Sequence, residues 1–267
     1  MSLDLDLDLD LALATARRAV EAAARASLVH FRQGVRVEVK PDRTPVTAAD
    51  RDAEAAVLAV VRQAFPGHAL LGEETGAHAG DASTRWIVDP IDGTRGFTRG
   101  GAFWGPLVAL EHEGNVVVGA MAMPALGETY WAARGRGAWM TRDGGPAVRL
   151  QVSGIADWAE SSFSFGEFRG VFAPERERAV LTLCRTAAQA RCYGDLAGAA
   201  MVLTGRAEAW VEAGVQVWDI APLLVIAEEA GGRFTDLAGR ATASSGNCVL
   251  SNGLVHDHVL RALAAPA

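Results

Sequence analysis

Three short apolar segments in the middle of the chain constrain its fold more than any other feature. They cover residues 103–110, 116–123 and 129–133, and glycine-containing turns separate them, Glu113-Gly114-Asn115 and Leu126-Gly127. Apolar runs of this length that are joined by such turns are typical of β-hairpins. The sequence therefore predicts an antiparallel β-meander between about residues 101 and 139.

The pattern changes beyond about residue 151, where candidate strands alternate with candidate helices. The expected strands cover residues 161–165, 191–193, 208–211, 233–235 and 248–251. The expected helices cover residues 175–190, 195–204, 219–230 and 253–263. Such alternation favours helices layered on a sheet. We expect two parts, residues 1–150 and residues 151–267, of which the second has α/β organisation. They share an interface because no Pro-, Ser- or charge-rich linker divides them.

The segment before the meander contains two predicted helices. The first covers residues 11–31 and follows a Leu-Asp repeat at residues 3–10, to which we assign no function. The second runs from about Thr47, a possible N-cap, to Phe65, where Pro66-Gly67 ends it. Strands are expected at residues 35–40 and 68–71.

Composition excludes several classes of protein. The chain has 267 residues, half of them hydrophobic, and a net charge of −7. An acidic chain lacks the clustered Lys and Arg of a nucleic-acid-binding surface, so we expect no nucleic-acid partner. No apolar run reaches the roughly 20 residues of a membrane span, and the N-terminus does not resemble a signal peptide. Three scattered cysteines form no disulfide framework. We expect a cytoplasmic protein with no membrane partner.

The chemistry of the chain concentrates in the segment Trp86-Ile-Val-Asp-Pro-Ile-Asp-Gly-Thr94. The apolar residues 86–88 predict a buried strand, and two carboxylates, Asp89 and Asp92, follow it directly. Gly93-Thr94 then precedes residues that can begin a helix. Hard divalent cations prefer carboxylate and carbonyl oxygens, and phosphate binds N–H groups at helix starts. The alternative for this motif taken alone is an ordinary surface turn.

Other acidic residues stand at comparable positions. Glu73 and Glu74 follow an expected strand, Asp50 lies early in the second helix, and Asp219 begins a strongly apolar helix. Each has an ordinary alternative explanation when taken alone: Asp219 as a helix cap, Asp50 as a solvated helix acid, and the two glutamates as a charged loop.

Taken together, these motifs resemble the inositol monophosphatase superfamily of metal-dependent phosphomonoesterases. The motifs are V-T-x-A-D at residues 46–50, G-E-E at 72–74, W-I-V-D-P-I-D-G-T at 86–94, and W-D-x-A with E-A-G-G at 218–232, all in the order of the family. The resemblance implies a layered αβαβα sandwich, with an α+β part over residues 1–150 and an α/β part over residues 151–267. It also implies two or three Mg²⁺ ions per subunit.

The resemblance assigns roles residue by residue. It implies one Mg²⁺ on Glu73, Asp89 and the backbone carbonyl of Ile91, and a second on Asp89, Asp92 and Asp219. Asp50 and Thr94 would act with Glu73 on the attacking water, and Gly93 and Thr94 would bind the phosphate through backbone N–H groups. Relatives are commonly homodimers, and lithium inhibition is a family trait.

The resemblance implies that the substrate is a small phosphate monoester. Gly96 stands where inositol monophosphatases more usually have Asn, and the stretches at residues 103–110, 123–131, 192–208 and 251–257 look closer to the histidinol-phosphate phosphatase branch. Glu212 would accept from a substrate hydroxyl or pair with the ammonium of histidinol phosphate, the alternative being a surface acid on an edge strand. Arg95 and Asp195 are rim candidates for selectivity. Arg99 is a weaker one, better explained as a solvated surface charge.

The leading hypothesis is therefore Mg²⁺-dependent hydrolysis of histidinol phosphate. The alternatives are an inositol-1-phosphate phosphatase or a phosphatase of broad sugar and nucleotide specificity. A non-catalytic metal-binding homologue would be expected to have lost at least one of the metal-binding acids or Thr94, and all are present. The histidines and cysteines form no ligand-like cluster and contribute nothing to the hypothesis.

Overall fold

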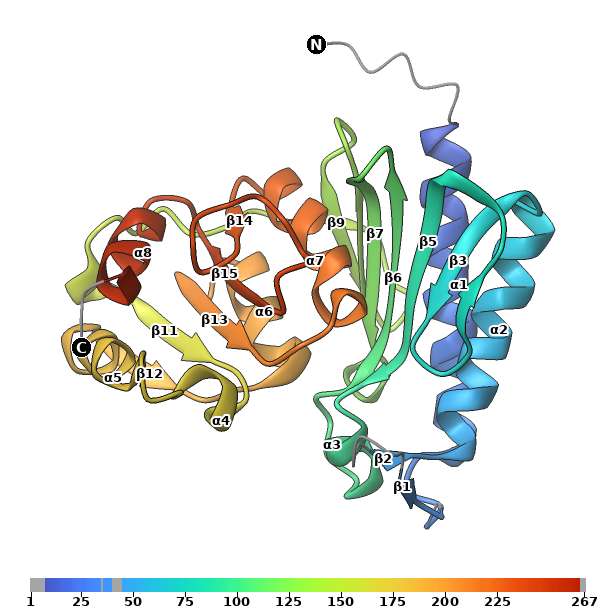
Figure 1. Ribbon diagram of the computed structural model, residues 1–267, viewed down its shortest axis with the longest axis horizontal. Coiled ribbons are helices and arrows are strands. Elements are labelled where there is room, and N and C mark those ends of the chain that lie inside the picture. The colour runs from blue at the N-terminus through green and yellow to red at the C-terminus, as the bar shows by residue number, and fades with distance from the viewer. Residues whose placement is uncertain (1–7, 35, 40–44, 265–267) are drawn as a thin grey trace.

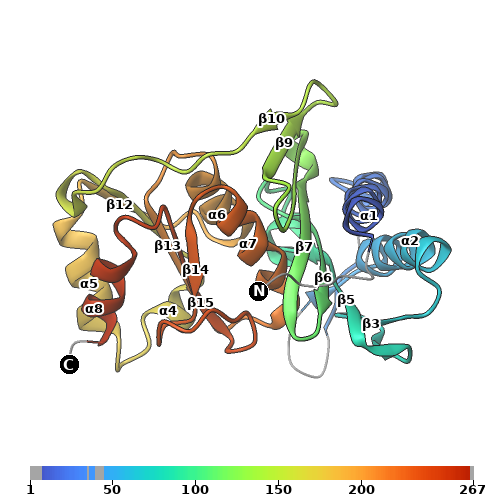
Figure 2. The same cartoon turned by 90° about the horizontal axis from the view of Figure 1, so that it is seen from above.

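The computed structural model describes residues 8–34, 36–39 and 45–264, which form five layers. In Figure 1 the layers follow one another across the molecule: helices α5 and α8, a small sheet, helices α6 and α7, a large sheet, and helices α1 and α2. Figure 2 shows the same succession from above. The expected αβαβα sandwich is therefore confirmed.

The large sheet contains the predicted meander. Among the described residues it has eight strands in the order β10-β9-β8-β7-β6-β5-β3-β4. Their bounds are β3 (His68–Gly72), β4 (Gly76–His78), β5 (Asp81–Asp92), β6 (Gly105–His112), β7 (Asn115–Met123), β8 (Glu128–Ala133), β9 (Ala138–Arg142) and β10 (Val148–Arg149). Neighbouring strands are antiparallel except β3 and β5, which are parallel. The turn η1 (Pro124–Leu126) lies between β7 and β8.

Two long helices cover the outer face of this sheet, α1 (Leu9–His30) and α2 (Ala48–Ala64). Asp8 caps α1 by accepting from the Leu11 N–H at 2.9 Å, and residues 3–7 of the Leu-Asp repeat lie outside the described residues. Thr47 caps α2, as predicted. A two-stranded ribbon of β1 (Glu38–Val39) and β2 (Pro45–Val46) precedes α2; Val35, Lys40 and residues 41–44 are outside the described part.

The small sheet has the strand order β12-β11-β13-β15-β14. Its strands are β11 (Ser162–Phe165), β12 (Gln189–Arg191), β13 (Ala209–Ala213), β14 (Arg233–Thr235) and β15 (Asn247–Ser251). Its helices are α4 (Phe168–Val171), α5 (Glu177–Thr186), α6 (Asp195–Leu203), α7 (Val217–Glu229) and α8 (His256–Ala264), and the turn η2 (Trp158–Glu160) precedes β11.

Three expectations for this half were wrong in detail. The helix expected over residues 175–190 ends at Thr186, and the strand expected at 191–193 lies at 189–191. The reason is pairing with a distant segment, because Gln189–Arg191 aligns in parallel with Ser162–Ser164 of β11. The last helix also begins at His256 rather than Gly253, whose backbone is left-handed with φ +81°.

Helix α7 joins the two halves into one core. Its residues 220–227 are all buried, and apolar side chains of both sheets pack in the same cluster with them. Gly119 of β7 permits this close packing, since a Cβ there would lie 2.4 Å from the carbonyl oxygen of Pro222. The N-terminus of α7 is thereby held against the large sheet. Among the described helices, none is both long and apolar enough to cross a bilayer.

Candidate active site

An irregularity in β5 brings its two acids to one side of the sheet. Asp89 pairs with Leu107 of β6 and Asp92 pairs with Gly105, so three steps along β5 match two steps along β6. Residues three apart in a regular strand point to opposite faces, and a bulge of one residue reverses that. Pro90, which lacks an N–H for the ladder, lies at this point.

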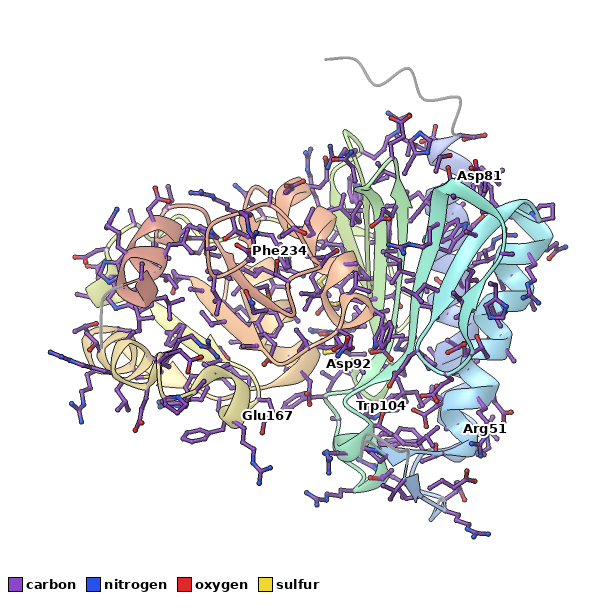
Figure 3. All side chains as sticks on the ribbon, viewed as in Figure 1. Arg51, Asp81, Asp92, Trp104, Glu167 and Phe234 are labelled. Carbon is purple, nitrogen blue, oxygen red and sulfur yellow. The ribbon has the colours of Figure 1, made fainter. Side chains whose placement is uncertain are left out.

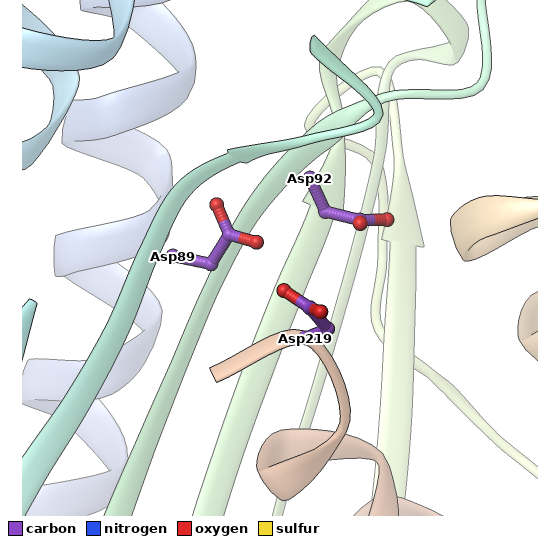
Figure 4. Close-up of side chains that lie close together, drawn as sticks. All are labelled: Asp89, Asp92 and Asp219. Atoms are coloured by element: carbon purple, nitrogen blue, oxygen red, sulfur yellow. The ribbon is translucent and has the colours of Figure 1, made fainter. Parts of the chain in front are cut away.

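Asp219 reaches the same place from the other half of the molecule. One oxygen from each of Asp89, Asp92 and Asp219 lies within 4.8 Å of the other two. Figure 4 shows the three carboxylates turned toward one another, two from β5 and one from the start of α7. Residues far apart in the sequence thus form one cluster of oxygen donors.

Hydrogen bonds fix the orientation of the acids that begin helices. Asp219 is the third residue of α7, and its Oδ2 accepts from the Gln216 N–H at 2.7 Å. Asp50 occupies the same position in α2, where its Oδ2 accepts from both the N–H and the hydroxyl of Thr47 at 2.7 Å. Both acids therefore serve as capping groups through one oxygen. Asp50 is fully buried, so the alternative of a solvated helix acid is wrong.

Thr94 connects Asp50 to the β5 motif. Its hydroxyl lies 3.3 Å from Asp50 Oδ1 and 2.9 Å from the Ile91 carbonyl oxygen. Asp89 is held from the other side, since its Oδ1 accepts from the Ile91 N–H at 2.9 Å. Ile91 therefore presents its carbonyl on the side of Thr94 and its N–H on the side of Asp89.

The segment after the acids makes a tight turn into α3 (Thr94–Thr98). Gly93 is the N-cap with φ +77°, a left-handed backbone that favours glycine. A Cβ at this position would also lie 2.8 Å from the Phe103 carbonyl oxygen. The predicted helix start at Gly93-Thr94 is confirmed. Arg95, the next residue, is exposed at the rim.

These residues line an open cleft with about 730 Å³ of empty space between the two halves. Its walls are formed by Pro45, Glu73, Asp89, Ile91, Asp92, Gly93, Thr94, Arg95, Glu167, Asp195, Gly214, Val215 and Asp219. Most of the residues predicted for the site are among them, while Asp50 lies behind Thr94. Figure 3 shows Asp92 where the halves meet and Glu167 on the C-terminal half. No histidine or cysteine is among the described residues that line the cleft.

A smaller pocket of about 360 Å³ adjoins the cleft. Its lining includes Asp195, Trp210 and Glu212 together with Asp92 and Asp219. Glu212 is 4% exposed and lies on β13, which pairs with β11 on one side and β15 on the other. The alternative of a surface acid on an edge strand is therefore wrong. Its Oε1 accepts from the Glu167 N–H at 2.9 Å.

Glu167 was not predicted as a site residue, because it belongs to none of the sequence motifs. It lines both the cleft and the adjoining pocket, and it lies two residues after Phe165, the last residue of β11. The only available signal was its position after a predicted strand, where loop residues often contribute to sites. Asp195, which had been proposed, has an unusual backbone with φ +36° at the start of α6.

Electrostatics in this region favour a bound cation. Burial raises the pKa of Asp89 well above its usual range, and the negative charges of Glu73, Asp219 and Asp92 raise it further. Burial and neighbouring carboxylates act in the same direction on Asp92. Burial raises the pKa of Asp219 to about 6 and that of Glu212 to about 7. Each acid resists ionisation chiefly because burial disfavours its charged form, and neighbouring carboxylates add to the effect.

The donor set fits a hard divalent cation. The atoms that converge are carboxylate oxygens, with the Ile91 carbonyl oxygen on the same cleft wall. Oxygen-only ligation suits Mg²⁺ or Ca²⁺ and disfavours the softer metals that require Cys or His. A divalent cation would also relieve the repulsion that raises the pKa values of these carboxylates.

Comparison with known proteins agrees with this geometry. The sequence profile of the inositol monophosphatase family matches residues 7–266. The histidinol-phosphatase of Mycobacterium tuberculosis is 42% identical over 231 residues, covering 86% of this chain and 89% of that protein. The histidinol-phosphatase of Streptomyces coelicolor is 38% identical over 245 residues, covering 90% and 92%.

A solved structure shows the same fold. The Thermotoga maritima IMPase superposes with a TM-score of 0.81 at 32% sequence identity, and the match covers 96% of each chain. The family profile spans nearly all of this chain, and the relatives are matched over most of their own lengths. The chain belongs to the inositol monophosphatase family and is a phosphomonoesterase.

Proposed function

We propose that this protein hydrolyses histidinol phosphate to histidinol with Mg²⁺ and an activated water. The observation that carries the proposal is the junction of two acidic regions in one cleft, the Asp89–Asp92–Asp219 cluster and the pocket around Glu212. The first region suits metal ions and a phosphate. The second suits a positively charged group on the same substrate.

The metal-binding roles follow the cleft wall. Glu73, Asp89 and the Ile91 carbonyl would hold one Mg²⁺, and Asp89, Asp92 and Asp219 would hold a second, so Asp89 would belong to both sets of ligands. Bound in pairs, such ions neutralise the phosphate charge and lower the pKa of water. A third ion would be held weakly near Glu73 and Asp50. Most of these ligands belong to residues 1–150, and Asp219 belongs to residues 151–267.

The water would be oriented by the residues behind the β5 motif. Thr94 lies within 3.3 Å of Asp50, so its hydroxyl can donate to that carboxylate and accept from a water in the cleft. Glu73, which also lines the cleft, would accept the second proton of the water. Gly93 and Thr94 would donate backbone N–H groups to the phosphate at the start of α3.

The substrate preference rests on charge. Histidinol phosphate carries an ammonium and an imidazole, whereas inositol 1-phosphate offers only neutral hydroxyls beyond its phosphate. Glu212 and Asp195 line the inner pocket, and a cation there would favour their ionised forms. The names of the two bacterial relatives support the same choice. Arg95 at the rim would contact the phosphate end of the substrate.

One substrate panel tests the proposal. We would compare kcat/KM for histidinol phosphate, inositol 1-phosphate, fructose 1,6-bisphosphate and adenosine 3′,5′-bisphosphate, each with Mg²⁺ and with EDTA. We expect strict Mg²⁺ dependence and the highest value for histidinol phosphate. A tenfold or greater preference for inositol 1-phosphate would reverse the substrate assignment in favour of the alternative, an inositol monophosphatase.

A matched pair of variants tests the role of Glu212. Glu212→Gln should raise KM for histidinol phosphate at least tenfold, because a neutral amide loses the charge-assisted bond. Glu208→Gln is the control: Glu208 is also buried and accepts from the Ser162 N–H at 2.5 Å, but unlike Glu212 it does not line the adjoining pocket. Equal effects of the two variants on KM would refute a direct role for Glu212.

Three further properties belong to this proposal. The family resemblance favours a homodimer, inhibition by lithium and a cytoplasmic location. Light scattering of the purified protein tests the first, and a lithium titration of the activity at fixed Mg²⁺ tests the second. Fractionation of cells from the source organism tests the third.

A further inference from the structure

A second buried acid on α2 contacts the turn that carries Glu73. Glu54 lies one helical turn after Asp50 on the inward face of α2, and both side chains are fully buried. Asp50 contacts the β5 motif through Thr94. Glu54 instead contacts residues 72–75, the end of β3 and the turn that leads to β4.

The Glu54 carboxylate fills this turn. Its Oε2 accepts from the Glu74 N–H at 2.8 Å, and its Oε1 accepts from the Thr75 N–H at 2.9 Å. The Thr75 hydroxyl also donates to Oε1. Gly72 permits the approach, because a Cβ there would lie 2.3 Å from Oε1. The Glu54 carboxylate thus accepts from three groups of the turn between β3 and β4.

A chain of side chains continues from Thr75 to the surface. The Thr75 hydroxyl lies 2.6 Å from His78 Nε2, and His78 Nδ1 lies 3.0 Å from a guanidinium nitrogen of Arg62. Arg62 can only donate, so Nδ1 accepts and Nε2 donates to Thr75. The single proton of the Thr75 hydroxyl is then left for Glu54. The direction of each hydrogen bond from Arg62 through His78 and Thr75 to Glu54 is therefore fixed.

The opposite side of the turn is attached to β5 beside the acidic cluster. The Glu73 N–H donates to the Val88 carbonyl at 3.1 Å, and Val88 directly precedes Asp89. Glu73 lines the cleft, and its charge contributes to the raised pKa of Asp89. Glu73 therefore lies between two fixed points, Val88 on one side and the Glu54 contacts of its next two residues on the other.

We propose that Glu54 is a positioning residue that fixes the carboxylate of Glu73 relative to Asp89 and thereby sets the affinity of the site for Mg²⁺. The proposal rests on the metal-binding role proposed for Glu73. Groups that orient metal ligands through hydrogen bonds typically change metal affinity or activity 10- to 100-fold when they are removed. The chemistry needs no contact between Glu54 and the substrate.

The test compares Glu54→Gln with Glu208→Gln, the buried glutamate outside the cleft that also accepts from a backbone N–H. Mg²⁺ binding is measured by calorimetry and by the rise in Tm with Mg²⁺ concentration, and kcat and KM are measured alongside. We expect Glu54→Gln to weaken Mg²⁺ binding about 10-fold or more, with KM for the substrate unchanged at saturating Mg²⁺. Glu208→Gln should keep the Mg²⁺ affinity of the wild type.

Two further variants make the result decisive. Thr75→Val removes one of the three bonds to Glu54 and should give a smaller shift in the same direction, so it replaces Glu54→Gln if that variant does not fold. Glu73→Gln should weaken Mg²⁺ binding directly. Normal Mg²⁺ affinity in Glu54→Gln and Thr75→Val together with a loss in Glu73→Gln overturns the positioning role alone. Normal affinity in Glu73→Gln overturns the proposed metal role on which it rests.

Discussion

Replacing Asp219 with asparagine should make the metal-free protein more stable while removing its activity. Burial raises the pKa of Asp219 from its usual 3.8 to about 6. At about 1.4 kcal/mol for each tenfold change in proton affinity, the difference corresponds to about 3 kcal/mol. Because Asp219 keeps some exposure and shares its surroundings with other acids, we expect about 1–2 kcal/mol to be measurable.

The direction in which stability changes with pH follows from proton linkage. The folded state binds a proton on Asp219 more tightly than the unfolded state, so stability falls as the pH rises from about 4 to about 6 and stays reduced above it. Asparagine cannot ionise, and its amide oxygen can still accept from the Gln216 N–H that Asp219 contacts at 2.7 Å. The variant therefore avoids the free-energy cost of ionising a buried carboxylate and keeps the helix cap.

Urea denaturation measures this difference. In EDTA at pH 7.5, Asp219→Asn should exceed the wild type by about 1–2 kcal/mol, and the gap should close at pH 4. In saturating Mg²⁺ the order should reverse, because only the wild type gains ligand binding energy. Asp157→Asn is the control, since Asp157 accepts from the Ala159 N–H at a helical turn outside the cleft. A variant less stable than the wild type in EDTA at pH 7.5 would refute the reasoning.

Three further predictions concern single residues. Asp89→Asn should keep the fold by circular dichroism and lose most activity at saturating Mg²⁺; turnover near the wild-type rate would contradict the metal-binding role proposed for Asp89. Gly93→Ala should lower both Tm and kcat, because alanine is strained by about 1–2 kcal/mol at φ +77° and its Cβ would lie 2.8 Å from the Phe103 carbonyl oxygen; an unchanged Tm would exclude this strain. Burial lowers the pKa of His256 from 6.5 to about 4, and its ring nitrogens contact Thr235 and Ser251 at 2.9 and 2.8 Å. The unfolded state therefore takes up a proton first, and stability from His256 falls by about 2 kcal/mol between pH 7 and pH 5; His256→Asn should show a correspondingly flatter pH dependence in urea titrations, and an equal slope would contradict the prediction.

Local sequence patterns predicted the elements that depend on near neighbours. The meander over residues 103–133 forms as expected because its turns are short and each strand pairs with the next one in the chain. The N-cap at Thr47 and the turn at Gly93 follow from side-chain and backbone preferences that act within a few residues. The acidic motifs likewise identified the family, since they consist of residues expected to act in the reaction rather than residues that pack the core.

Sequence patterns gave wrong or missing predictions where contacts with a distant segment of the chain determine the structure. Residues 187–190 could continue a helix on local preference, but pairing in parallel with β11 ends α5 at Thr186. Glu212 resembled an edge-strand acid because sequence order does not give strand order in a mixed sheet. Glu54 carried no signal of its own, since the contacts that define it come from a turn some twenty residues later.

The sequence by itself thus determined which acids the chain carries, the helix starts at Thr47 and Gly93-Thr94, and which family the chain belongs to. Only the tertiary structure decided how those acids meet. The bulge at Pro90 turns Asp89 and Asp92 to one side, and the packing of α7 between two sheets brings Asp219 to them. Side-chain direction in a bulged strand depends on its partner, and the position of a helix depends on the surfaces that bury it, so neither is encoded within a short stretch of residues.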